Sequence, residues 1–480
     1  MIMKGFTRKF KPLEILTNEQ VEAIYQSALD VLQETGVRVG HERALKLLAD
    51  HGCEADFDKE RVRIPGWLVE ECLRKCPSSL IVRARNSKNS VRIGRNTLYF
   101  ENSIGMKIID LDTWEPRPAT MSEQHEGVRV LDALDNLHLL TTYTPYAEIE
   151  GVPPCVTMLE SLASRIRNSA KCEAASHFNG SEIFAIRMAK AVGMDLLGTI
   201  TASPPLTYYE DAVEAAFRFA EAGFPISIGS CTVMGGSGPV TIAGATVISS
   251  AELMAGIVLT QLIKPGLGVQ VNDSVYPMDM HRGHLAFGAS GAALHNVVFN
   301  QIWRRRKIPT CSWVAGVTSS KQIDFQCAYE RGMTALLCAL SGSNLISLHG
   351  AVYGELAFHP VQAVLDDDIA GWAGRCIEGV EVTDETLAIG LIEEVGPIPG
   401  CYLNKEHTRK WWKTEQFVPK VADRESYPEW IRRGKKAAMA LAKERVEEIL
   451  ATHKPTPLTS EQEQSIEDIL KEAREYYMQR

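Results

Sequence analysis

The side chains that could do chemistry share one position: each lies at or just after the end of a short apolar segment. They are Glu101, Asn102, Tyr143, Thr144, Tyr146, His177, Phe178, Cys231, Asn272, Asp273, Tyr276, Trp313, His349 and Tyr353. The set is rich in aromatic rings and poor in Lys and Arg, which an anionic substrate would need. Aromatic faces with a few carboxylates suit an organic cation, because they hold it by cation–π attraction. The alternative, that these rings are ordinary packing, stays open from spacing alone.

A glycine-rich loop, Gly235–Pro239, stands between one apolar segment and a long apolar stretch. Its backbone amides could form a nest for an anion. The loop does not match the GxxxxGK[ST] pattern of phosphate-binding loops. A tight turn, or room for a large planar ligand to approach the backbone, is therefore an equal interpretation.

The HxxH spacing of His281 and His284 raises the question of a zinc site. No Cys or carboxylate completes a plausible ligand set around them, and the chain has no CxxC pair. We therefore predict structural or surface histidines and no metal. No GxSxG nucleophile motif occurs, although spacing does not exclude a hydrolase.

Eight apolar segments read as parallel strands that are covered on both faces. They are Leu98–Asn102, His138–Thr144, Cys172–His177, Gly198–Ala202, Pro225–Ser230, Gly268–Asn272, Thr310–Ala315 and Asn344–His349. Helical patterns alternate with them, near residues 122–135, 156–169, 181–193, 208–222, 240–263, 285–306, 324–341 and 361–378. Eight such units predict a closed (β/α)8 TIM barrel, whose active site lies where the strands end. A doubly wound open sheet is the alternative, but no nucleotide fingerprint follows an early strand.

The regions on either side of the barrel, which we place at 97–400, have a different character. Residues 1–96 predict an N-terminal helical cap, with helices near 18–36, 41–51 and 65–75 and small strands near 80–83 and 90–93. Residues 401–480 predict a C-terminal helical arm, with helices near 428–450 and 459–478.

Bulk properties exclude several classes of protein. A net charge of −9 argues against a nucleic-acid binder. Val240–Ile263 is apolar enough to resemble a membrane span, but Glu252 and Gln261 within it favour a buried barrel helix. Scattered cysteines, odd in number, and a polar N-terminus predict reduced thiols in a cytoplasmic protein without a membrane partner.

Four long blocks of the sequence are similar to one known family. They are residues 6–39, 110–137, 235–266 (GGSGPVTIAGATVISSAELMAGIVLTQLIKPG) and 406–430 (EHTRKWWKTEQFVPKVADRESYPEW). These blocks resemble the trimethylamine methyltransferase family, and the similarity covers nearly the whole chain. The resemblance implies a (β/α)8 barrel that demethylates an amine and passes the methyl group to a cobalt(I) corrinoid. It also implies that the corrinoid (a cobalamin) is carried by a separate cognate protein and that the enzyme is a homo-oligomer.

Founding members of that family carry pyrrolysine, whereas this chain contains only standard residues. It therefore resembles the pyrrolysine-lacking branch, which acts on quaternary amines, with glycine betaine as the best-known substrate. The missing residue would lie near Thr318–Lys321. A quaternary nitrogen needs no such residue, because it already carries the positive charge and leaves as a neutral amine. No cofactor is expected to be tightly bound to this chain.

The resemblance gives the candidate residues expected roles in binding the substrate. Glu101 or Glu355 would balance the ammonium charge, and His349 is the first choice for hydrogen bonding a substrate carboxylate. A structural histidine bonded to a backbone carbonyl is the alternative for His349. The candidates for an aromatic cage are Tyr99, Phe100, Tyr143, Trp313, Tyr353 and Phe358.

Weaker expectations concern polar contacts and the corrinoid. Asn102 is a secondary candidate for the substrate, and Asn272 could contact either the substrate or the corrinoid. The corrinoid would approach the loop at Gly235, Gly236 and Gly238. Two other functions stay open: methyl transfer from another betaine or from trimethylamine, and non-enzymatic binding of quaternary amines.

Overall fold

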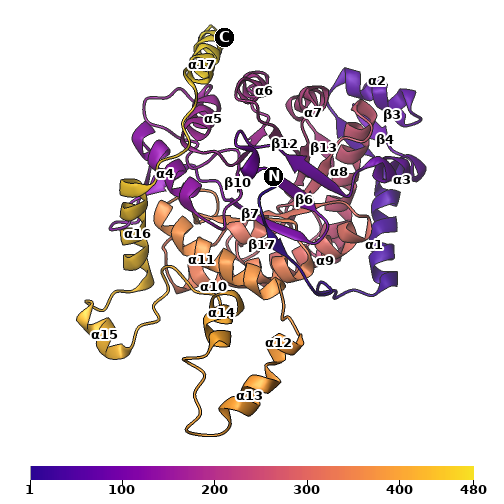
Figure 1. Ribbon diagram of the computed structural model, residues 1–480. Helices are drawn as coiled ribbons and strands as arrows, with labels where there is room; N and C mark the ends of the chain where they lie inside the picture. The colour runs from indigo at the N-terminus through magenta and orange to yellow at the C-terminus, as the bar shows by residue number, and fades with distance from the viewer. Residues whose placement is uncertain (1, 480) are drawn as a thin grey trace.

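Eight parallel strands close into a barrel at the centre of the protein, in a computed structural model that describes residues 2–479 (Figure 1). They are β7 (Thr97–Asn102), β10 (Leu139–Leu140), β11 (Cys172–Ser176), β12 (Leu196–Ala202), β14 (Ile226–Ser230), β16 (Val269–Asp273), β19 (Thr310–Ser312) and β20 (Leu345–His349). The barrel is closed because β7 pairs in parallel with β20 on one side and with β10 on the other. The predicted (β/α)8 barrel is confirmed, and each strand lies where its apolar segment was expected.

The helices of the barrel lie outside the strands, and each follows its strand as expected. They are α4 (Met121–Ala133), α5 (Thr157–Asn168), α6 (Glu182–Ala191), α7 (Glu210–Ala222), α8 (Ile242–Ile263), α9 (Ser290–Arg305), α10 (Phe325–Ser341) and α11 (Pro360–Ile377). Local sequence sets their ends. Thr120 and Glu123 form a capping box at the start of α4, and Gly223, with φ of 82°, ends α7 in the left-handed conformation.

Helix α8 is long and apolar enough to cross a membrane by composition, but 72% of its most apolar window is buried inside the protein. Two helices of the N-terminal cap, α1 (Asn18–Asp30) and α3 (Gly66–Lys75), cover its outer face. A helix that is apolar all round is what such a doubly covered position requires.

The N-terminal cap combines short helices and strands. After α1 come a π-helical turn (Val31–Thr35), β2 (Val37–Val39), α2 (Glu42–Asp50), β3 (Glu54–Asp56), β4 (Arg61–Arg63), α3, β5 (Ser79–Val82), a 3-10 turn (Ser87–Asn89) and β6 (Val91–Gly94). The β5–β6 hairpin places Leu80 and Ile93 against apolar side chains of the barrel interior, so it closes the N-terminal end of the barrel. Ahead of the cap, β1 (Phe6–Thr7) pairs with the start of β7.

Short elements after the barrel strands build the rim at the opposite end. They are β8 (Lys107–Ile109), β9 (Pro116–Arg117), β13 (Thr207–Tyr208), β15 (Val233–Met234), β17 (Tyr276–Asp279), β18 (His284–Leu285), a 3-10 turn (Trp313–Gly316), β21 (Ala351–Val352) and β22 (Ala357–Phe358). The strand expected over Thr310–Ala315 therefore ends at Ser312 and continues as the 3-10 turn.

The C-terminal region is helical, as expected. It contains α12 (Asp384–Leu387), α13 (Ile389–Val395), α14 (Glu406–Glu415), α15 (Tyr427–Arg432), α16 (Ala438–Thr452) and α17 (Ser460–Met478). The single helix expected over 428–450 is wrong, because the chain breaks between α15 and α16. Gly434 and Lys435 both adopt positive φ there, at 87° and 56°, which ends an α-helix.

A buried ion pair ties α10 and α11 to the strand ends. Arg331 donates to both carboxylate oxygens of Asp366, at 2.9 and 2.7 Å, and to the carbonyl oxygens of Gly316, Leu348 and Ala351. Both side chains are fully buried. Asp366 also accepts the backbone N–H of Gly350 at 2.8 Å. One cation thus fixes the loops after β19 and β20.

We expect Arg331→Met to lower the free energy of unfolding by about 3–5 kcal/mol, because it leaves the Asp366 carboxylate buried without its partner. Urea unfolding measures this change. Arg305→Met, at an exposed position on α9, is the control and should change stability by less than ~0.5 kcal/mol. A loss no larger than that of the control would show that this ion pair does not hold the loops.

Candidate active site

Side chains of the barrel strands alternate between the interior and the surrounding helices, and this alternation decides which residues reach the mouth. Tyr99 lies inside, in a cluster with Leu139, Leu197 and Leu345. Glu101, two residues further along β7, therefore points inward as well, nearer the carboxyl end of the strands. Phe100 lies between them and belongs to a different cluster, against the outer helices.

Glu101 is a carboxyl group inside the barrel, with a relative exposure of 2%. The indole Nε1–H of Trp313 donates to its Oε1 at 2.7 Å, and the thiol of Cys311 donates to the same atom at 3.4 Å. Burial raises the pKa of Glu101 to about 7, although these two hydrogen bonds oppose the shift. Glu101 is thus poised between its neutral and charged forms near neutral pH.

A second carboxyl group, Glu355, lies among tyrosines at the rim. Burial raises the pKa of Glu355. Its negative charge in turn adds to burial in raising the pKa values of Tyr143 and Tyr276, so the three groups lie close to one another. Both tyrosines therefore stay protonated and can offer a neutral ring face to a ligand.

Cys231, at the end of β14, marks a recess in the mouth. Its side chain is accessible to solvent, yet burial, followed by the charge of Glu355, raises its pKa to about 12. A group that solvent reaches but that protein atoms largely desolvate lies in a concave site. The thiol stays protonated at neutral pH, so Cys231 contributes no charge to this recess.

The loop after β20 holds Glu355 in place. Tyr353 adopts a φ of 52°, which is unusual for a bulky residue. Its neighbour Gly354 has a φ of 59°, and a Cβ there would lie 2.5 Å from the ring of Phe287. The ring of Phe287 packs edge-on against Tyr276, with centroids 5.1 Å apart. Close packing of this loop therefore positions both Glu355 and Tyr276.

Tyr353 reaches the rim, but one protein cation already covers its ring. The ammonium group of Lys321 lies 4.3 Å from the ring centroid, and it also donates to the carbonyl oxygen of Ser319 at 2.8 Å. The loop Thr318–Lys321, where the resemblance placed the missing pyrrolysine, thus lies next to the mouth. The Thr318 hydroxyl anchors it by donating to Glu330 at 2.5 Å.

Polar side chains from β16 and β12 complete the inner wall. Asn272 is aligned with inward-facing Cys311 on the neighbouring strand, so it also points inward. It is 4% exposed, and its Oδ1 has no hydrogen-bond partner among residues 2–479. Thr199 and Thr201 of β12 also face inward and are half-buried. The sequence analysis missed both threonines, although their alternation within an apolar segment was a usable signal.

The expected roles of Tyr99, Phe100 and Phe358 in an aromatic cage do not agree with their positions. The hydroxyl of Tyr99 donates to the carbonyl oxygen of Met3 at 3.1 Å, at the opposite end of the barrel. Phe100 and Phe358 are fully buried among side chains of the surrounding helices. Alternation along a strand sends half of its aromatic residues outward, which composition alone does not reveal.

His349 and Asn102 also lie away from the mouth. Alternation from Ser347 would point His349 inward, but an irregularity in the pairing of β20 with β7 between these two residues reverses it. His349 is fully buried, with Nε2 3.5 Å from Asp367 of α11. Asn102 bonds Thr141, Ser103 and Thr144, so it fixes the start of the next loop. Neither residue is placed to contact a substrate.

The glycine loop is a tight turn and not an anion nest. Gly235 N–H donates to the Gly238 carbonyl at 3.0 Å, and the amides of Gly236 and Gly238 both donate to the Val233 carbonyl. These three N–H groups are therefore used within the loop. Gly236 is exposed, and the loop contacts the side chains of Met278 and Met280 at the rim.

Among residues 2–479 no group of three or more His, Cys, Asp or Glu side chains is arranged to hold a metal ion. His281 is exposed in a turn, and His284 lies on β18, not at the start of α9 as expected.

These features define a class of protein: a (β/α)8 barrel whose mouth carries two carboxyl groups and several aromatic rings. The family described as trimethylamine methyltransferase (MTTB) matches residues 1–476. The chain therefore belongs to the trimethylamine methyltransferase family.

Several characterised relatives are similar over nearly their whole length. A glycine betaine methyltransferase from Desulfitobacterium hafniense (strain Y51) is 31% identical, over 93% of this chain and 94% of its own. A trimethylamine methyltransferase, MttB, from D. hafniense (strain DSM 10664 / DCB-2) is 30% identical, over 96% and 94%. The crystal structure of the Methanosarcina barkeri monomethylamine methyltransferase (MtmB) covers 97% of this chain and 88% of its own, at 11% identity and a TM-score of 0.52. That similarity concerns the fold.

The raised pKa of Glu101 predicts how stability depends on pH. The folded protein keeps the proton up to about pH 7, whereas the unfolded chain releases it near pH 4.5. Folding stability should therefore fall as pH rises from about 4.5 to 7, by up to about 3 kcal/mol from this group. Glu101→Gln keeps an acceptor for Trp313 and should remove this part of the dependence. Urea unfolding of both proteins at pH 5, 6, 7 and 8 measures it, and parallel curves would contradict the assignment.

Proposed function

We propose that this enzyme transfers a methyl group from a quaternary amine to the cobalt(I) corrinoid of a separate protein. The observation that carries the proposal is the composition of the mouth: Glu101 and Glu355 supply negative charge, and Trp313, Tyr143 and Tyr276 supply ring faces. A trimethylammonium group donates no hydrogen bond, so cation–π attraction and nearby carboxylates are the interactions available to it. The relative named a glycine betaine methyltransferase supports this choice of substrate.

The reaction requires little chemistry from the protein itself. The cobalt(I) corrinoid supplies the electron pair that attacks the methyl carbon, the C–N bond breaks with its electrons going to nitrogen, and a neutral tertiary amine leaves. This chain would hold the ammonium group and aim one methyl group toward the rim. Because the positive charge on nitrogen disappears in the transition state, the site should hold the cation without binding it too tightly.

Glu101 fits this requirement because its pKa lies near 7. A bound cation stabilises the carboxylate form, and loss of the cationic charge during reaction lets the carboxyl group take a proton again. Trp313 keeps the carboxyl group oriented in both states, since its N–H can donate to either form. The buried carboxyl group would thus follow the charge of the substrate.

For the particular substrate we propose glycine betaine, which would give dimethylglycine. Its carboxylate would lie toward the rim, where Lys321 offers an ammonium group. Trimethylamine is the second candidate, because the relative from D. hafniense strain DSM 10664 / DCB-2 is named for it. The two candidates differ in whether Lys321 has a partner: Lys321→Met should impair betaine turnover but leave turnover of trimethylamine unchanged.

A direct test mixes the enzyme with free cob(I)alamin and single amines and follows methylcobalamin by its absorbance. We expect product from a quaternary amine, with glycine betaine first. Trp313→Leu should lower kcat/KM by about 30-fold, because a desolvated cation–π contact contributes about 2 kcal/mol. Trp67→Leu, at a site 57% exposed on α3, is the matched control and should leave turnover unchanged. Absence of methylcobalamin from all quaternary amines and from trimethylamine would overturn the proposal.

Binding of the substrate should strengthen with pH. Because the carboxylate form of Glu101 attracts the cation, apparent affinity should rise about tenfold between pH 6 and pH 8, with the midpoint near 7. Isothermal titration calorimetry with glycine betaine in two buffers of different ionisation enthalpy also counts the proton released on binding below pH 7. Glu101→Gln should show neither effect. Affinity of the unaltered enzyme that does not change with pH would contradict the role of Glu101.

A further inference from the structure

Residues 379–403, which we call the apolar arm, leave the barrel after α11 and extend away from it (Figure 1). Apolar side chains of the arm are exposed along its whole length. Val380, Val382, Ile389, Ile398 and Leu403 have exposed fractions of 78, 71, 57, 96 and 83%. Contiguous apolar surface of this kind marks an interaction site.

The helices of the apolar arm need a packing partner. Helix α12 has 4 residues and α13 has 7, and neither contains a buried residue. Isolated helices shorter than about 12–15 residues are marginal in water. Since no other part of residues 2–479 buries these two helices, another molecule must supply their packing.

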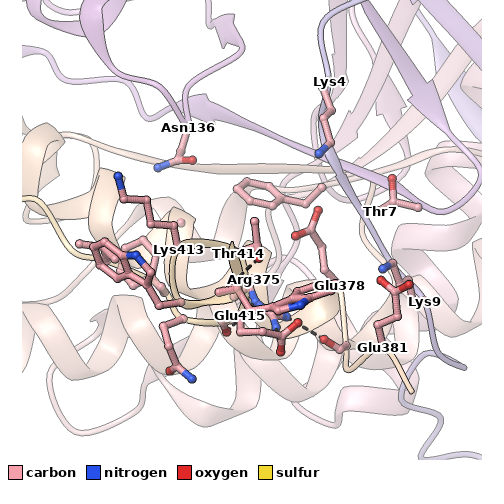
Figure 2. Close-up of a pocket in the computed structure, with 18 residues that line it drawn as sticks. Lys4, Thr7, Lys9, Asn136, Arg375, Glu378, Glu381, Lys413, Thr414 and Glu415 are labelled. Atoms are coloured by element: carbon pink, nitrogen blue, oxygen red, sulfur yellow. Dashed lines mark hydrogen bonds and ion pairs between the residues drawn. The ribbon is translucent and has the colours of Figure 1, made fainter. Parts of the chain in front are cut away.

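A groove of about 830 Å³ lies beside the base of the arm, between β1, the end of α11 and α14. Its walls carry the aromatic rings of Phe6, Trp411, Trp412 and Phe417. Figure 2 shows Lys4 and Lys9 on one side of this groove and Lys413 on the other. Arg375 at its base already pairs with Glu415 at 3.2 Å. The groove therefore offers aromatic walls and three exposed ammonium groups.

The apolar arm has the complementary chemistry. Between residues 378 and 404 the chain has acidic residues but no Lys or Arg. Glu394 pairs with Lys405 at 2.6 Å and Glu385 with Lys410. Asp384 and Glu393 have no ion-pair partner within residues 2–479. An acidic, apolar segment thus lies next to a cationic, aromatic groove on the same chain.

We propose that a second copy of this chain covers this face, with the apolar arm of each copy seated in the groove of the other. One chain carries both halves of the contact, which is the requirement for a two-fold symmetric interface. The arm and the groove together supply roughly the 20–30 residues that each side of a stable interface contributes. Because α11 runs from the carboxyl ends of the strands to their amino ends, this interface lies away from the mouth. The proposal is independent of the reaction proposed above.

The test is the mass of the full chain in solution, measured by sedimentation equilibrium over a range of concentrations. We expect the unaltered chain to contain at least two copies and Ile389→Glu/Ile392→Glu to dissociate. The double variant should raise the dissociation constant at least ~100-fold, because it places two unpaired charges in the interface. Phe57→Glu, at a site 51% exposed in the N-terminal cap, is the control and should leave the mass unchanged.

A second variant and a second measurement keep the result clear. Leu403→Glu, at the far end of the apolar arm, should also dissociate the assembly, with an unfolding midpoint unchanged in the isolated monomer. Amide hydrogen exchange should show residues 384–395 protected in the assembly and unprotected after dilution. A monomeric unaltered chain, or an assembly that tolerates both arm variants, would overturn the proposal.

Discussion

The hydrogen bond from the Trp313 indole to Glu101 is the contact on which the mouth of this barrel depends. It holds a carboxyl group in a place where water is largely excluded, so the charged form of that group is costly. The same bond fixes a large ring beside the carboxyl oxygen. A site built this way favours a permanent cation, since a cation removes the cost of the charge without needing a hydrogen-bond donor of its own.

The scaffold makes this contact possible by separating two halves of the barrel interior. Apolar side chains around Tyr99 and the β5–β6 hairpin close the amino end of the strands, so water can reach Glu101 from one direction. At the other end, Arg331 and Asp366 fix the two loops that carry Trp313 and Glu355. The site is therefore rigid in its base and open only where a methyl acceptor would approach. The loop residues Met278 and Met280 and the glycine turn form part of that approach.

Much of the fold could be predicted because parallel strands that are covered on both faces are apolar throughout, and eight such runs are visible in the sequence. The break between α15 and α16 was missed, because Gly434 and Lys435 act through backbone conformation. The aromatic and polar residues at the strand ends were found, but their facing was not. His349 shows why: a single irregularity in β20 turns a side chain from the interior to the helices. Glu101 and Trp313 were both identified, whereas their mutual hydrogen bond needs the closed barrel and has no local signal.

The most direct test of the charge-based site compares glycine betaine with its uncharged isostere, in which a tert-butyl group replaces the trimethylammonium group. Both have nearly the same shape, so the ratio of their dissociation constants isolates the contribution of the positive charge. Measured by calorimetry at pH 8, the cation should bind at least about 30-fold more tightly. Equal affinities would mean that shape alone selects the ligand, and that the carboxyl and aromatic groups at the mouth do not recognise charge.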